Sequence, residues 1–226
     1  MPSFETLAAK KRGNIFKAVT SALFLAPKSA ELVDSVYDRT SGELLALPEG
    51  YQPIGWVDGD DGITWGRETD NSETIGHGSA YPVRTDITQD TTTMQVKFLE
   101  TNAATLGLMY NQPNMQANLN TDTGSIIVDQ ALTPPKLNYR FLAIGRDGAG
   151  ADAIYFLRLM PSATISEYGE TTWNNEDVPG FDVTLTAEPD DEAGFAVRNM
   201  VTGPGLTDER LADMGFTVSG SSTPSP

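Results

Sequence analysis

Residues 91–111, TTTMQVKFLETNAATLGLMYN, decide the fold class because they join a strand pattern to a helix start. Apolar and polar side chains alternate over residues 93–98, as they do in a strand that has one buried face. The apolar positions are Met94, Val96 and Phe98, and the polar positions are Thr93, Gln95 and Lys97. The passage therefore predicts a strand with one face toward a core and the other toward lumen or solvent.

A short helix is predicted directly after this strand, at about residues 102–110. Asn102 suits the N-cap position, because its side chain can accept a hydrogen bond from a backbone N–H of the first turn. Leu106, Met109 and Tyr110 follow at a spacing that places them on one face of a helix. We expect that face to cover the sheet.

The rest of the chain is rich in strand patterns separated by turn residues. Besides residues 93–98, strands are predicted at residues 14–27, 54–57, 63–67, 72–75, 81–88, 124–129, 137–144, 153–160, 164–168, 181–188 and 195–200. Those at 137–144 and 153–160 are apolar at successive positions, so we expect them to be covered on both faces. The fold class predicted is mainly β: an antiparallel β-sandwich or barrel with one flanking helix.

The chain divides into three parts. Residues 1–13 are polar and basic and predict a mobile arm. Residues 14–205 hold the strands and form one domain, long enough to bury its own core. Within it, residues 28–53 show no sustained period and predict a long loop, with one or two helical turns at 30–37 as an alternative. Residues 206–226 form a C-terminal segment: a short helix capped by Thr207, then a low-complexity tail.

The charge is strongly negative and unevenly distributed. The chain carries a net charge of −16, but residues 1–28 hold five basic residues and one acid, so they are positive while the remainder carries −20. Such a body repels nucleic acid, which argues against tight DNA binding. Acidic charge also keeps a protein in solution, and that explanation stands beside any functional one.

Several classes of site are excluded by composition. The absence of cysteine rules out disulfides, thiolate metal sites and cysteine nucleophiles. No apolar run has the length of a membrane span, and the longest lacks a signal-peptide cleavage site. We therefore expect a soluble, unprocessed chain with no membrane partner.

The acidic clusters do not match a metal-binding motif. Residues 58–62, DGDDG, start like a calcium loop, but the sixth and twelfth positions are Ile63 and Thr69 instead of Gly and Glu. A hairpin turn explains these residues better. Residues 190–192, DDE, are expected at an exposed hairpin tip rather than around a cation. We predict no metal-binding residues and no cofactor.

Catalytic motifs are equally weak. His77, the single histidine, lies in a predicted loop tip between two glycines, and no Gly-x-Ser-x-Gly elbow is present. Residues 145–150, GRDGAG, lack the lysine of a phosphate-binding loop. Thirty-one acids always offer some carboxylate pair, and none stands out for hydrolysis. We predict no catalytic residues and no enzyme activity.

Four passages, in their order and spacing, carry a resemblance to a known family. They are residues 15–27 (IFKAVTSALFLAP), 55–62 (GWVDGDDG), 84–110 (RTDITQDTTTMQVKFLETN followed by AATLGLMY) and 181–205 (FDVTLTAEPDDEAGFAVRNMVTGPG). Together they resemble the major tail (tail tube) proteins of long-tailed, siphovirus-type bacteriophages, especially those of actinobacterial hosts. The resemblance spans about residues 14–205, and the segment 28–53 is longer than the family leads us to expect.

The resemblance implies a structural virion protein with a β-sandwich or barrel and one flanking helix. It implies hexameric rings stacked into a tube around a tape-measure protein, with tail terminator and distal tail or baseplate proteins at its ends. The tube is assembled in the host bacterial cytoplasm and delivers DNA to the host. An acidic lumen would let DNA pass without specific binding.

Three segments are the expected contacts between subunits: the 28–53 loop, the 67–82 hairpin and the basic arm. A positive arm against an acidic neighbouring ring would favour assembly and would weaken with salt. Lys97 is the residue that opposes an acidic lumen if it faces inward.

Two other functions remain as alternatives. The first is a carbohydrate-binding β-sandwich module of adhesin or baseplate type, with Trp56, Trp65 and Trp173 as a stacking platform. Trp56 and Trp65 are, however, expected to pack within the sandwich. The second is a hydrolase that uses a pair of carboxylates.

Overall fold

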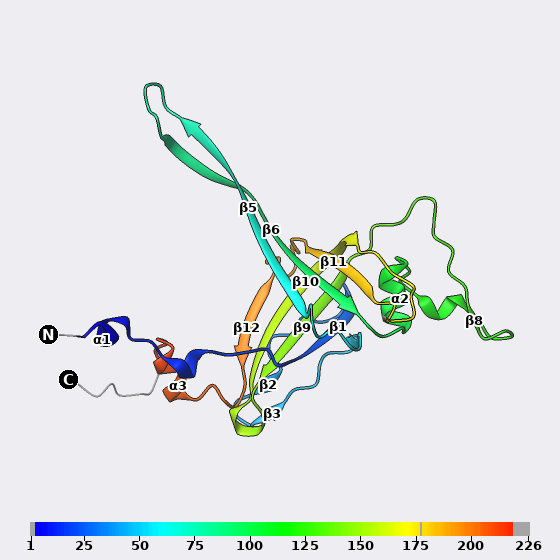
Figure 1. Cartoon of the computed structure of the whole chain (residues 1–226), viewed down its shortest axis with the longest axis horizontal. Coiled ribbons are helices and arrows are strands. Elements are labelled where there is room, and N and C mark those ends of the chain that lie inside the picture. Colours follow the sequence, from blue (N-terminus) through cyan, green and yellow to red (C-terminus); the bar gives the residue numbers. More distant parts are fainter. Residues whose placement is uncertain (1–2, 177, 219–226) are drawn as a thin grey trace.

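An antiparallel sheet forms the body of the protein in the computed structural model, which describes residues 3–176 and 178–218 (Figure 1). The sheet has eight strands: β1 (Thr20–Pro27), β4 (Gln52–Pro53), β5 (Ile63–Ile75), β6 (Pro82–Phe98), β9 (Tyr139–Asp147), β10 (Ile154–Tyr168), β11 (Phe181–Ala187) and β12 (Arg198–Thr202). Their order is β4-β1-β9-β10-β11-β6-β5, and β12 pairs with β10. The predicted fold class, mainly β and antiparallel, is confirmed.

Short elements lie around this sheet. Two small ribbons pair β2 (Tyr37–Asp38) with β3 (Glu43–Leu44), and β7 (Leu119–Asn120) with β8 (Ser125–Ile126). The helices are α1 (Phe4–Ala8), α2 (Ala103–Met109) and α3 (Asp208–Asp213), with 3-10 turns η1 (Arg12–Asn14), η2 (Met115–Asn118) and η3 (Gly150–Asp152). The predicted tail from Ser219 lies outside the described residues, as do residues 1–2 of the arm.

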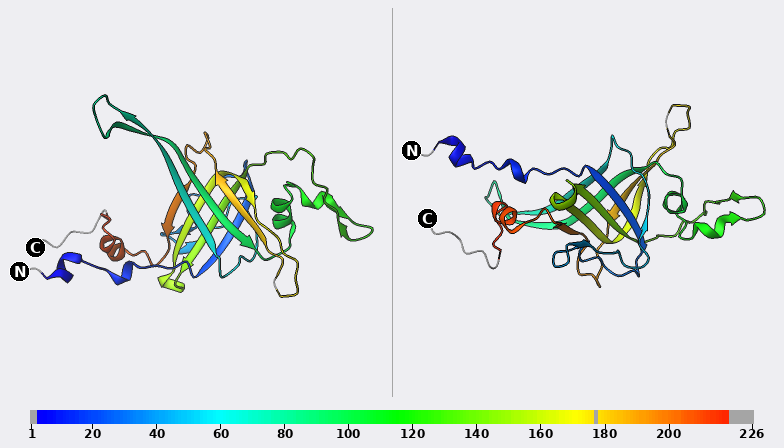
Figure 2. Two further views of the ribbon diagram at one scale, coloured as in Figure 1. Left: turned by 45° about the horizontal axis from the view of Figure 1, so that its top comes forward. Right: turned by 90° about the horizontal axis from the view of Figure 1, so that it is seen from below.

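The main core lies inside the curl of the sheet. Strands from both ends of the strand order contribute to one apolar cluster, so the sheet wraps around it (Figure 2). The most deeply buried members include Leu23, Met94, Phe98, Phe141, Met160 and Leu185. An isolated bridge between Val57 and Phe98 helps to close the curl.

The strand at residues 93–98 is buried on one face, as its alternation predicts. Met94, Val96 and Phe98 are at most 1% exposed, and they lie on β6 beside β11. The polar positions of the same strand face outward: Gln95 is exposed, and Thr93 and Lys97 are half-buried.

The predicted helix is present, but its buried face is shifted. Asn102 caps α2 by accepting hydrogen bonds from the backbone N–H groups of Ala104 and Thr105. Leu108 and Thr105 are the fully buried side chains, whereas Leu106 and Met109 are only partly buried against the core. Leu106 and Met109 therefore pack against the core as predicted, but the most buried side chains lie on the neighbouring part of the helix surface, and Tyr110 is only half-buried.

Residues 28–53 cover the outer face of the sheet. Val33 and Val36 are buried against Leu142, Leu157 and Leu159 of β9 and β10, which forms a second apolar cluster. The prediction that these two strands are covered on both faces is therefore confirmed. The segment is loop except for β2, β3 and β4, and residues 30–37 contain no helix.

Several predicted strand limits were wrong. The strands expected at 63–67 and 72–75 are one strand, β5, and those at 81–88 and 93–98 are one strand, β6. Residues 54–57 form only the Val57 bridge, and the strand expected at 195–200 begins at Arg198. A register shift between Asp70 and Asn71 explains the first error, because two residues that disfavour strands lie at a β-bulge inside one.

Candidate assembly surfaces

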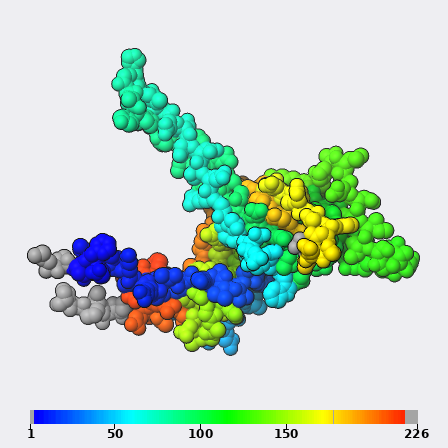
Figure 3. Space-filling model, viewed as in Figure 1, coloured from blue at the N-terminus to red at the C-terminus, as the bar shows by residue number. Residues whose placement is uncertain are grey.

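The hairpin of β5 and β6 is the most prominent surface feature, and its outer part stands clear of the body (Figures 1 and 3). At its base β6 pairs with β11 through residues 93–98. Beyond that point the two strands pair only with each other, and residues 67–75 and 80–90 are all exposed. The predicted 67–82 hairpin is the outer part of this longer structure.

Apolar side chains are exposed along the outer half of the hairpin. Ile75, Tyr81, Val83 and Ile87 are between 65% and 80% exposed. His77 lies in the turn at the tip, as predicted, where Gly78 has a φ of 81°. A group of exposed apolar side chains on an otherwise polar strand pair is typical of a surface that another chain covers.

One ion pair joins the two strands of the hairpin in the exposed region, and a second lies along β6. The Arg67 guanidinium donates two hydrogen bonds to the Asp90 carboxylate, at 2.8 and 2.5 Å. The hydrogen bond from Arg67 lowers the pKa of Asp90. Arg84 donates similarly to Asp86 at 2.6 Å, two residues along the same strand. No sequence motif signals the pair between Arg67 and Asp90, because it depends on the hairpin register.

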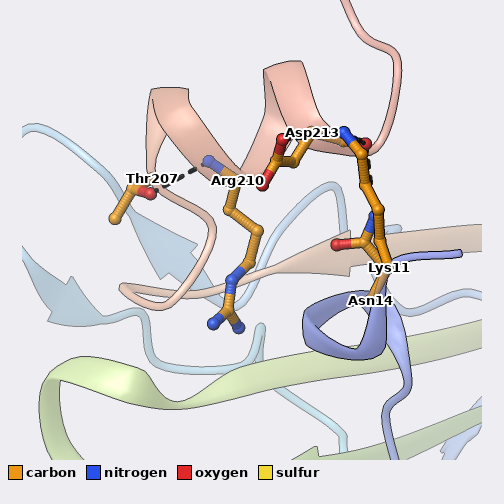
Figure 4. A network of polar contacts seen from close by, with 5 residues as sticks. All are labelled: Lys11, Asn14, Thr207, Arg210 and Asp213. Atoms are coloured by element: carbon orange, nitrogen blue, oxygen red, sulfur yellow. Dashed lines mark hydrogen bonds and ion pairs between the residues drawn. The ribbon is translucent and has the colours of Figure 1, made fainter. Parts of the chain in front are cut away.

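The N-terminal arm lies against the C-terminal helix (Figure 4). Lys11 Nζ donates to the backbone oxygen of Asp213 at 2.9 Å and to its carboxylate at 2.7 Å, and the Asn14 amide donates to the same backbone oxygen. Thr207 caps α3, as predicted, by accepting from the Arg210 N–H. The Arg210 guanidinium lies 5.7 Å from the Phe16 ring centroid. The arm and the C-terminal segment thus form one extension of the body.

Lys97 is neutralised by a partner from the acidic turn. Its Nζ lies 3.3 Å from the Asp58 carboxylate. Asp58 also accepts hydrogen bonds from the N–H groups of Asp60 and Asp61, and these bonds together with Lys97 lower its pKa. The residues 58–62 form a tight turn, but it enters β5 from a loop rather than from a strand, so it is not a hairpin turn.

Asp190 corrects the expectation of a fully exposed acidic tip. Its side chain is buried, while Asp191 and Glu192 are exposed. Burial opposes its ionisation, but hydrogen bonds from the N–H groups of Ala193 and Glu192 and the charges of Lys28 and Arg140 keep its pKa below the usual value. Asp190 therefore fixes the turn before β12 to the body.

The tryptophans do not form a joint stacking platform. Trp65 is half-buried under the Arg158 guanidinium, 4.6 Å from the ring centroid. Trp56 is 76% exposed and Trp173 is 89% exposed, so the expectation that Trp56 packs inside was wrong. Trp56 and Trp65 line different cavities, which removes the main support for a carbohydrate-binding module.

Within the described residues, no group of three or more His, Asp or Glu side chains is placed to hold a metal ion. In the same part of the chain, no helix has the length and apolar character needed to cross a membrane.

The chain was compared with curated proteins and with solved structures. No curated protein matches the chain. Among solved structures, the anti-feeding prophage baseplate is 9% identical over 82% of this chain and 94% of that chain, with a TM-score of 0.38. The tube-terminating cap of the anti-feeding prophage is 10% identical over 84% of this chain and 91% of that chain, with a TM-score of 0.36.

A family model described as phage tail tube protein matches residues 8–197, from the arm to the residue before β12. This family is structural rather than enzymatic, which confirms the prediction that the chain is not an enzyme. Most of the chain lies within the match, and the chain belongs to the phage tail tube protein family.

Proposed function

We propose that copies of this chain form hexameric rings that stack into a tail tube, through which DNA is delivered to the host. The structural role in the tail follows from the family. The ring number, the stacking and the passage of DNA are the proposal. The observation that carries it is the β5–β6 hairpin, a long paired segment that the subunit itself leaves uncovered.

The hairpin needs a partner for physical reasons. A two-stranded hairpin without further cover is at best marginally stable in water. Here its outer half has no core, and four large apolar side chains are exposed along it. Contact with a neighbouring ring would bury these side chains and order the hairpin. The assembled tube would thus provide the apolar cover that the single subunit lacks.

The charge distribution supports passage of DNA without binding. The chain carries −16 overall, and eight of its fifteen Lys and Arg side chains form ion pairs with carboxylates of the described residues. Lys97, the cation on the polar face of β6, is matched by Asp58. If this face lines the lumen, it offers phosphate no unpaired cation at that position.

The proposal extends to the surroundings of the tube. We propose a tape-measure protein inside it, tail terminator and distal tail or baseplate proteins at its ends, and assembly in the cytoplasm of the host bacterium. We also propose a siphovirus-type tail and an actinobacterial host, on the resemblance of the four sequence passages alone.

Substitution at the hairpin tip tests the proposal. The variant Tyr81→Ser/Val83→Ser removes exposed apolar area without touching the core, so its melting temperature should match that of the unmodified chain. Negative-stain microscopy should show rings or tubes for the unmodified chain and few or none for the variant. A matched control, Leu44→Ser, changes an exposed leucine on β3 and should assemble normally. Normal tubes from the tip variant would contradict the role of the hairpin.

A further inference from the structure

The N-terminal helix α1 carries an apolar face that its own chain leaves uncovered. Phe4 and Leu7, one helical turn apart, are 73% and 70% exposed, and α1 has no buried residue. The helix is nonetheless well formed, because the Ser3 side chain accepts from the Thr6 N–H and Ala9 closes the C-terminus in a left-handed conformation. The apolar face of Phe4 and Leu7 therefore lies on an ordered helix and is free to contact another chain.

The contact between Lys11 and Asp213 keeps α1 away from the body. Lys11 and Asn14 hold the arm to α3, and α1 precedes this anchor (Figure 4). In Figures 1 and 2, α1 lies at one end of the long axis, beyond α3. Its apolar face cannot reach the core of the same chain while the anchor is made.

An apolar cavity lies at the opposite end of the molecule. It has a volume of about 320 Å³ and is lined by the C-terminal end of α2, the end of β10 and residues 130, 131, 134 and 135. Its apolar and aromatic lining residues include Met109, Tyr110, Pro134, Pro135 and Tyr168. The Asn111 amide donates to the Pro135 backbone oxygen at 2.7 Å, which holds the loop over α2.

The segment after α1 is basic, and the chain next to the cavity is acidic, so the two regions have opposite charge as well as exposed apolar surface. Lys10 and Arg12 follow α1, and neither forms an ion pair among the described residues. Asp129 and Glu170 are exposed and lie within two residues in sequence of Gln130 and Tyr168, which line the cavity, and neither forms an ion pair in the described part of the chain. A cavity of about ten water volumes is large enough for an aromatic side chain.

We propose that α1 of one copy inserts Phe4 and Leu7 into the cavity beside α2 of a second copy, with Lys10 and Arg12 toward Asp129 and Glu170 of that copy. The contact joins different surfaces of two identical chains, so it repeats from copy to copy in a head-to-tail manner. The inference rests on the proposed function, because a tube is what brings the two ends of neighbouring copies together.

A pair of introduced cysteines tests the contact directly, since the chain has none of its own. Chains carrying Phe4→Cys and chains carrying Ala131→Cys are mixed in equal amounts, assembled and treated with a short bis-maleimide. Ala131 lines the cavity and is exposed. The cross-linked dimer should exceed that of the control pair Phe4→Cys with Leu44→Cys by about tenfold, because a docked pair has a high effective concentration.

Filling the cavity gives a second measurement with a close control. Ala131→Trp occupies the mouth of the cavity and should reduce the assembled fraction. Leu132→Trp adds the same ring one residue further on, at a fully exposed position that does not line the cavity, and should leave assembly unchanged. Equal effects of the two substitutions would count against the inference.

The outcomes separate the two proposals. If the unmodified chain forms tubes while the cysteine pair gives no more dimer than its control, the inference is overturned and the proposed function stands. If the unmodified chain forms neither rings nor tubes, the proposed function fails and the inference fails with it.

Discussion

Phe98 shows how much a single residue contributes to this fold. It is fully buried, lies opposite Phe181 in the β6–β11 register and forms an isolated bridge to Val57. Alternation in the sequence predicted its burial. The partners could not be predicted, because they come from distant parts of the chain.

Truncation of this side chain should be strongly destabilising. Phe98→Ala removes a buried ring and leaves a cavity, so we expect a loss of about 3–5 kcal/mol in the free energy of unfolding. Urea unfolding of the monomer measures it. Gln95→Ala, at an exposed position of the same strand, should change the free energy of unfolding little. A loss below about 1 kcal/mol for Phe98→Ala would contradict the account of the core.

The Asp58 carboxylate predicts how stability depends on pH. Its pKa is lowered from 3.8 in the folded chain by the N–H groups of Asp60 and Asp61 and by Lys97. Its contribution is therefore complete above the ordinary value of 3.8 and is lost as the pH falls through the lowered pKa. Unfolding followed from neutral to acid pH should show a smaller acid loss for Asp58→Asn than for the unmodified chain. Identical pH profiles would contradict the contact.

At the scale of elements, sequence patterns within a few residues predicted strands and helices well, whereas contacts between distant segments were not predicted. The strand and capped helix of residues 91–111 are both present, because alternation and capping act within a few residues. On α2 the deepest burial falls on Thr105 and Leu108 rather than on the predicted Leu106 and Met109, because burial depends on the angle at which the helix meets the sheet. The covering role of residues 28–53 was missed since Val33 and Val36 have no regular spacing, and only the curved sheet makes them core residues.

The cap of α2 can be tested by two substitutions at one position. Asn102 accepts from the first turn of the helix and also donates to the Ile54 backbone oxygen at 2.7 Å. Asn102→Ala removes both functions and should cost about 1–2 kcal/mol of stability. Asn102→Asp keeps the cap and removes the donor, so thermal unfolding should place it between Ala and the unmodified chain. The opposite order would show that the cap is unimportant.

At the scale of the whole molecule, the segments that project from the sheet are the ones expected to contact other subunits. The hairpin, the arm with α3 and the loop around β7 and β8 project in different directions from the curled sheet (Figures 1 and 2). The sequence predicted the hairpin and the basic arm as contacts between subunits, and both stay predictions. The proposed contact between the apolar face of α1 and the cavity beside α2 could not be predicted from the sequence, because a cavity exists only in the folded chain.

The uneven charge predicts that assembly depends on salt. Residues 1–28 are positive and the body carries −20, so attraction between the arm and a neighbouring subunit is screened as salt rises from about 0.1 M to about 1 M. Sedimentation should show a falling assembled fraction over this range. A chain that lacks residues 2–13 should assemble less at low salt and respond less to added salt. Normal tube length and yield from that chain would exclude a role for the arm.

Cryo-electron microscopy of the unmodified chain under assembly conditions tests the central claim most directly. The account predicts stacked rings of six subunits around an open channel, with the outer half of each β5–β6 hairpin buried against a neighbouring ring. A monomer that stays dispersed at high concentration, or a tube in which residues 67–90 face bulk solvent, would contradict it.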